Sequence, residues 1–144
     1  MKWINNYLLA QYKDGGRGPH EWDCWGLTRH VRHEHLGQQL LPSYGNLRNS
    51  DPKAFTKAYD AEAALMEECD AEIGAIAAVM HGALCTHVAV VVEVDGRLSI
   101  LEINPNTGAR RLSIPEFERI YLKVRYHHDR NLSESTGGGA IGAS

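Results

Sequence analysis

Residues 12–27 have the sequence YKDGGRGPHEWDCWGL, in which a glycine-rich loop runs directly into the expected start of a helix. The segment GGRGP at residues 15–19 indicates the loop, because glycine and proline interrupt regular structure. Asp23 is of a residue type that caps helix N-termini through its side chain. The stretch therefore predicts a helix that begins at Cys24, with this cysteine in the first turn and the glycine-rich loop beside it.

Three helices are expected in the first half of the chain. Apolar residues at helical spacing predict one over residues 3–12, and the second runs from Cys24 to Leu36, with Gly37 as its stop. The third begins at residues 50–52, a capping residue followed by proline in the first turn. Its apolar stripe consists of Phe55, Ala58, Tyr59, Leu65, Met66 and Cys69. On the second helix, Leu27 and Val31 are expected to point inward, and Arg29, Arg32 and Glu34 into solvent.

The second half of the chain has the composition of a sheet. Asp95-Gly96 is a strong signal for a two-residue hairpin turn, and a short helix is expected near Pro115. Helices followed by antiparallel strands predict an α+β domain, in which N-terminal helices pack on an antiparallel β-meander. The predicted strands cover residues 73–80, 87–94, 97–104 and 121–127.

The chain has 144 residues, which fits one domain. Its formal net charge of −3 argues against a dedicated nucleic-acid-binding protein. We expect no membrane-spanning helix, because no apolar run approaches about 18 residues, and the N-terminus lacks the apolar stretch of a signal peptide. The Ser- and Gly-rich segment 131–144 is predicted to be a flexible tail, which leaves residues 1–130 as the folded domain.

Cys24 has the surroundings of a reactive thiol. A helix N-terminus carries partial positive charge that favours a thiolate, nearby glycines let a substrate backbone approach, and free amides of the first turn can stabilise an oxyanion. The negative charge of Asp23 disfavours a thiolate at Cys24. We therefore expect Asp23 to serve as the helix cap rather than to activate the thiol. The alternative is a structural cysteine buried in a helix, whereas a nucleophile is expected to be partly exposed. The other cysteines, Cys69 and Cys85, leave an odd count that argues against a disulfide framework.

A nucleophilic cysteine needs a base, and the base needs an orienting group. Pairing outward from the Asp95-Gly96 turn sets Ala89 opposite Glu102 and His87 opposite Asn104, so these four side chains share one face. The other face, with Val88, Val90, Val92 and Val94, is predicted to be core. His87 is therefore the candidate base. Glu102 is favoured as its orienting residue, because a carboxylate stabilises an imidazolium whereas an amide only fixes the tautomer. Asn104 is the alternative, since a bulge would shift the register.

Residues 12–27 resemble the nucleophile segment of the NlpC/P-sixty cell-wall peptidases. That segment runs from a tyrosine through a Gly-Gly loop, a proline and an aromatic residue to Asp-Cys-x-Gly-Leu. THVAVV at residues 86–91 resembles the family's base strand, Ser-His-Val-Gly-Ile, and ILE at residues 100–102 resembles the next strand, which usually carries a histidine. The resemblance covers residues 3–127. The form Asp-Cys-Trp-Gly-Leu in so short a chain is similar to variants found among phage tail proteins.

This resemblance implies a papain-like NlpC-type fold and a cysteine endopeptidase that cleaves amide bonds in peptidoglycan stem peptides. It implies that Cys24 is the nucleophile, His87 the base, Glu102 the residue that orients the imidazole, and Tyr12 a hydroxyl that helps hold the oxyanion. The implied setting is a phage tail. The protein would be made in the host cytoplasm, carried in the virion with tail-tip or hub proteins, and used in the host cell envelope during genome delivery. We expect no cofactor and no metal.

Two departures from the family and two other functions stay open. Gly74-Ala75 stands where many relatives have Gly-Asp, and Glu102 replaces the commoner histidine. The chain could instead be a catalytically silent structural tail-tip protein, or an acyltransferase or amidase that acts on another amide. His30 and His33 form only a weak zinc pattern. The residues His81, Cys85 and His87 could bind adventitious metal, and His127 and His128 are expected to be exposed.

Overall fold

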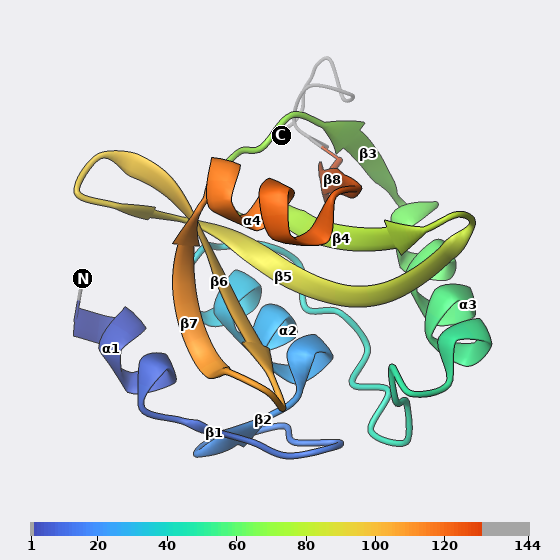
Figure 1. The fold of residues 1–144 in the computed structure, drawn as a ribbon, viewed down its shortest axis with the longest axis horizontal. Coiled ribbons are helices and arrows are strands. Elements are labelled where there is room, and N and C mark those ends of the chain that lie inside the picture. The colour runs from blue at the N-terminus through green and yellow to red at the C-terminus, as the bar shows by residue number, and fades with distance from the viewer. Residues whose placement is uncertain (1, 131–144) are drawn as a thin grey trace, which may run out of the picture.

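The protein is organised around a six-stranded antiparallel sheet with the strand order β3-β8-β4-β5-β6-β7. The computed structural model describes residues 2–130. Consecutive strands β4 to β7 form a meander, and β8 returns to lie between β3 and β4 (Figure 1). The strands are β3 (Met66–Cys69), β4 (Ile76–His81), β5 (Leu84–Val94), β6 (Arg97–Asn104), β7 (Gly108–Ser113) and β8 (Val124–Asp129).

Helices cover both faces of this sheet. The described residues contain four helices: α1 (Lys2–Leu8), α2 (Cys24–Glu34), α3 (Pro52–Ala63) and α4 (Ile114–Tyr121). Two short strands, β1 (Gln11–Tyr12) and β2 (Glu21–Trp22), form a separate parallel pair. Helices combined with an antiparallel sheet confirm the predicted α+β class. No helix within residues 2–130 is long and apolar enough to span a membrane.

The core has two layers, one on each side of β5. Val88, Val90 and Val92 are fully buried and pack toward α2 and α3, as predicted, while Val94 is half-buried. The opposite face of β5 is also covered, because Phe117 of α4 packs against it. Figure 1 shows α4 in front of the strands and α2 behind them. The face that carries His87 is therefore enclosed by α4.

The hairpin between β5 and β6 has the predicted register. Val94 pairs with Arg97 and Val90 with Leu101, so the two strands align about the Asp95-Gly96 turn. Asp95 and Gly96 both have positive φ, which is the requirement of a tight two-residue hairpin turn. The sheet does contain an irregularity near His87, but it lies between β4 and β5, at Val79 and Met80.

Several predicted boundaries are wrong because long-range pairing overrides local periodicity. The first helix ends at Leu8, since residues 11–12 pair with β2. The third helix ends at Ala63, and residues 66–69 form β3 against β8. Strand β7 was not predicted, and residue 121 lies in α4 rather than in the last strand. The predicted tail 131–144 falls outside the described residues.

Arg32 is buried rather than solvated, contrary to the prediction. Its side chain has no exposed surface, its Nε donates to the backbone carbonyl of Gly74 at 2.8 Å, and one terminal nitrogen bonds Asp129 Oδ1 at 2.5 Å. Both partners lie far away in sequence, before β4 and at the end of β8. Helical spacing alone could not reveal them, and together they attach α2 to the sheet.

Candidate active site

Asp23 ties the glycine-rich loop to the start of α2. Its Oδ1 accepts hydrogen bonds from the backbone N–H of Gly26 at 2.8 Å and from Arg17 at 2.6 Å, and its Oδ2 accepts from the N–H of Gly15 at 3.1 Å. The predicted cap is therefore confirmed, with Cys24 as the first residue of the helix. Arg17 pairs with the carboxylate and so offsets its negative charge beside the thiol.

Gly26 is required by a close approach between the loop and the helix. A Cβ added at this position would overlap the backbone carbonyl oxygen of Gly16. The same carbonyl accepts hydrogen bonds from the N–H of Asp23 and from Arg17. The Asp-Cys-Trp-Gly sequence thus allows loop and helix to meet without a side chain between them.

Cys24 is buried, with 3% of its surface exposed, whereas the sequence predicted a partly exposed thiol. It belongs to a core cluster that includes Trp25, Phe55 and Val88. Leu41, Tyr44 and Leu47, from the connection between α2 and α3, also belong to this cluster or pack on it. The thiol is therefore part of a core built from residues distant in sequence, a long-range effect that the local motif does not encode.

His87, near the start of β5, lies between Cys24 and a carboxylate. Its Nε2 donates to Glu102 Oε1 at 2.7 Å, and its side chain is 6% exposed. Burial by itself lowers the pKa of His87, but hydrogen bonds and charge interactions with Cys24 and Glu102 outweigh it and raise the pKa to about 9. The imidazolium form of His87 is therefore favoured at neutral pH.

Glu102 is completely buried and accepts three hydrogen bonds. Besides His87, its donors are Arg110 Nε at 2.6 Å and the Tyr121 hydroxyl at 2.7 Å. Burial opposes ionisation, yet the bonds from these three donors lower the pKa of Glu102. Asn104 instead accepts the backbone N–H groups of residues 106 and 107 and so holds the β6–β7 turn. Of the two predicted orienting residues, Glu102 is the one that contacts His87.

Three residues of the site were not identified from the sequence. Arg17 lies in the predicted loop, but its pairing with Asp23 has no local signature. Arg110 reaches Glu102 from β7, directly opposite it in the register. A turn at Thr107-Gly108 directly before residues 108–113 is a signal in the sequence that could have indicated strand β7. Tyr121 comes from α4, and its ring also lies over His87 with centroids 5.3 Å apart.

Tyr12 lies near the thiol, but its hydroxyl is engaged elsewhere. The hydroxyl donates to Asp14 Oδ1 at 2.7 Å. Burial, then the hydrogen bond to Asp14 and, more weakly, the charge of Cys24, raise the pKa of Tyr12. Tyr12 therefore stays a neutral donor near Cys24, and it must release Asp14 before it can bind an oxyanion.

The other two cysteines of the described residues, Cys69 and Cys85, do not have the surroundings of a nucleophile. Burial raises the pKa of Cys85 to about 12, and burial followed by the charge of Glu72 does the same for Cys69. Such thiols are protonated at neutral pH and are poor nucleophiles. The weak zinc pattern on α2 does not converge, because His30 Nδ1 bonds the Tyr7 hydroxyl and His33 Nδ1 the carbonyl of Gln38.

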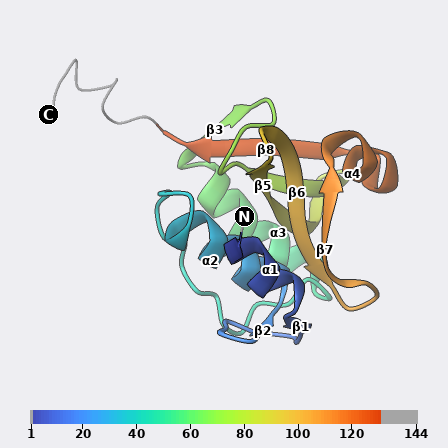
Figure 2. The ribbon, with the colours of Figure 1, turned by 90° about the vertical axis from the view of Figure 1, so that its left-hand side faces the viewer.

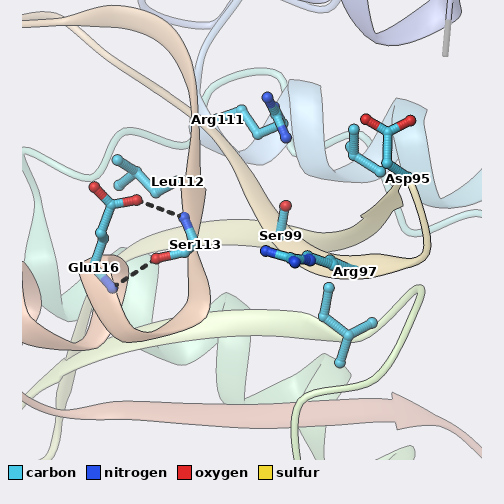
Figure 3. Close-up of a pocket in the computed structure, with 9 residues that line it drawn as sticks. Asp95, Arg97, Ser99, Arg111, Leu112, Ser113 and Glu116 are labelled. Carbon is cyan, nitrogen blue, oxygen red and sulfur yellow. Dashed lines mark hydrogen bonds between the residues drawn. The ribbon is translucent and has the colours of Figure 1, made fainter.

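A separate shallow groove of about 530 Å³ lies beside the β5–β6 turn (Figure 3). Its lining includes Arg97, Ser99 and Arg111, together with Ser113 and Glu116, whose mutual hydrogen bonds cap α4. It lies at the opposite end of β6 from Glu102 and contains neither Cys24 nor His87. The groove is therefore distinct from the Cys–His site.

Comparison with protein-family models and with curated proteins gives no match for this chain. Its function must therefore be inferred from the geometry and chemistry of the site.

Proposed function

We propose that the protein is a cysteine endopeptidase of the NlpC/P-sixty type, with a papain-like fold, that cleaves amide bonds in peptidoglycan stem peptides. The observation that supports this most strongly is the continuous arrangement Cys24–His87–Glu102. The thiol comes from a helix N-terminus, and the base and its carboxylate come from adjacent strands β5 and β6. The class of substrate comes from the resemblance of residues 12–27 and 86–102 to that family.

Each side chain has one role in the proposed reaction. The Cys24 thiolate attacks the carbonyl carbon, and His87, as imidazolium, gives its proton to the departing amine as the C–N bond breaks. A water molecule then attacks the thioester as neutral His87 takes its proton, the C–S bond breaks, and the acid product leaves with the Cys24 thiolate and His87 imidazolium restored. Glu102 keeps the imidazole ring in place and stabilises its charged form.

The tetrahedral intermediate needs donors for its oxyanion. The cap already occupies the amide of Gly26, which leaves the amides of Cys24 and Trp25 in the first turn of α2. Tyr12 adds a hydroxyl when it turns from Asp14 toward the substrate. This donor set supports acyl-transfer chemistry at the start of α2.

We further propose that the protein acts as a phage tail component. It would be made in the host cytoplasm, assembled with tail-tip or hub proteins, and used to open the cell wall during genome delivery. The support is the Asp-Cys-Trp-Gly-Leu form of the motif in a short chain. The formal net charge of −3 does not favour nucleic acid as a partner and is compatible with the proposed protein partners.

The burial of the thiol favours a second candidate, a catalytically silent structural protein of the same fold. Cys24 and His87 are 3% and 5% exposed, so a substrate reaches them only after surrounding side chains move. In the silent protein the site would stay closed, and the buried pair would serve only to join α2 to the sheet.

A turnover assay on purified peptidoglycan separates the two candidates. The endopeptidase releases new amino groups from stem peptides, keeps its activity in EDTA, and loses it after thiol alkylation. Intact peptidoglycan after prolonged incubation with folded protein would favour the silent structural role. Loss of activity in EDTA that zinc restores would contradict the cysteine mechanism.

A further inference from the structure

A second group of reactive side chains lies where β3 meets β8. Cys69 ends β3, His128 lies near the end of β8, and Glu72 follows in the turn after β3. The Cys69 sulfur, a Glu72 carboxylate oxygen and a His128 ring nitrogen all lie within 4.8 Å of one another. In both views β3 lies at the opposite end of the molecule from β1 and β2, which lead into Cys24 (Figures 1 and 2).

We propose that Cys69, Glu72 and His128 form a binding site for a zinc ion. Zinc binding would displace the proton of the Cys69 thiol into solvent. Zinc takes the resulting thiolate together with an imidazole and a carboxylate, and a water molecule completes four-coordination. Ligand bonds of about 2.0–2.3 Å place tetrahedral donor atoms roughly 3.3–3.8 Å apart. Small side-chain rotations are therefore enough to close the three observed atoms around an ion.

Strand pairing explains why these side chains converge. Cys69 pairs with Tyr126, and Glu67 pairs with His128, so all four side chains lie on one face of the β3–β8 ladder. Cys69 and His128 are diagonal neighbours, and the turn brings Glu72 back over them. The ligands thus come from two strands and a turn whose backbone is fixed by the sheet.

The charges around the site favour a divalent cation. Glu67 lies on the same face as His128, and Asp70 and Glu72 are close enough to act electrostatically on the Cys69 thiol. The basic neighbour Arg125 points to the opposite face, where it binds both carboxylate oxygens of Glu68 at 3.0–3.1 Å. The ligand face therefore has excess negative charge without an opposing basic side chain from that strand pair.

The proposed ion would be structural rather than catalytic. It would join β3 and the following turn to the end of β8, where the described chain ends. A ligand that binds only the folded state stabilises it by mass action. Zinc is therefore expected to raise the melting temperature without being needed for hydrolysis at Cys24, and the site is independent of the proposed function.

Metal titration of the full chain tests this site, with Co²⁺ as the spectroscopic probe and Zn²⁺ as competitor. We expect one equivalent of metal, a thiolate-to-cobalt charge-transfer band, and a higher melting temperature with zinc. Cys24→Ala should keep all three properties, which separates this site from the Cys24–His87 pair. Cys69→Ser and His128→Gln should weaken metal binding by at least about tenfold. Removing a residue that only hydrogen-bonds to a metal ligand already lowers metal affinity by about that factor, and removing the ligand itself should cost no less.

Alkylation of the wild-type protein gives a measurement that does not depend on a variant folding. Zinc should slow modification of Cys69, read by peptide mass spectrometry, relative to its rate in EDTA. Failure of the wild type to bind a stoichiometric metal ion would overturn the proposal. So would a cobalt spectrum that survives in Cys69→Ser and disappears in Cys24→Ala, because the metal would then occupy the other thiol.

Discussion

Replacing Glu102 with glutamine removes the charge that the structure places behind His87 while keeping the size of the side chain. The bond between His87 and Glu102 is buried and 2.7 Å long. A hydrogen bond to a charged group contributes about 1.5–3 kcal/mol, which corresponds to a decrease of roughly 10- to 150-fold in kcat. The pKa of His87 should also fall, so the alkaline limb of the activity profile should move to lower pH.

The stability of Glu102→Gln should decrease as well, because Arg110 and Tyr121 lose a charged acceptor. We expect a loss of about 2–4 kcal/mol in the free energy of unfolding, which is less than for a fully buried pair because the Arg110 side chain is 30% exposed. The assay is the rate of amino-group release from peptidoglycan across pH, measured well below the melting temperature.

Asn104→Ala is the matched control for this experiment. Asn104 holds the turn after β6, and its hydrogen bond to the Tyr121 hydroxyl is long, at 3.5 Å, so its loss should reduce stability by about 1 kcal/mol and lower kcat much less than Glu102→Gln does. If Asn104→Ala is severely impaired while Glu102→Gln is near normal, the assignment of Glu102 is wrong. A papain-like Cys-His-Asn arrangement would then replace it.

Two further predictions concern pH and backbone packing. Because the pKa of His87 rises from 6.5 to about 9 in the folded protein, its ion pair contributes stability that is complete below pH 6.5 and is lost as the pH rises through about 9. Chemical denaturation at several pH values should show this decrease in the free energy of unfolding of the wild type. If the free energy of unfolding of His87→Gln depends on pH in the same way, the prediction is contradicted. Gly26→Ala should separate the glycine-rich loop from α2, because the new methyl group meets the Gly16 carbonyl, and should abolish hydrolysis with a loss of about 1–3 kcal/mol in stability. Gly45→Ala, where the added Cβ meets only Ser43 Oγ at 3.9 Å, is its control, and equal activity of the two variants would show that the close approach is unimportant.

The features that the sequence predicted correctly depend on near neighbours. Asp23 caps a helix that starts one residue later, and the Asp95-Gly96 turn sets the pairing of the two strands beside it. That register places His87 and Glu102 on one face, so their contact followed from counting residues outward from the turn.

The features that were missed depend on distant partners. Arg32 is buried because Gly74 and Asp129 accept its hydrogen bonds, and neither is related to it by helical spacing. The segment 66–69 has apolar residues at helical spacing, yet pairing with β8 makes it a strand. His127 was expected to be exposed but is buried against Tyr59. Cys24 is buried in a core cluster with Phe55 and Val88, which the motif does not indicate.

The most direct test of the central claim compares hydrolysis of peptidoglycan by the wild type and by Cys24→Ala. Because the thiol is buried, the substitution should cost about 1 kcal/mol in stability, so both proteins are assayed at a temperature where circular dichroism shows them folded. The account predicts that the wild type releases new amino groups from stem peptides and that Cys24→Ala releases none above background. Substantial hydrolysis by purified, folded Cys24→Ala would contradict the assignment of Cys24 as the nucleophile.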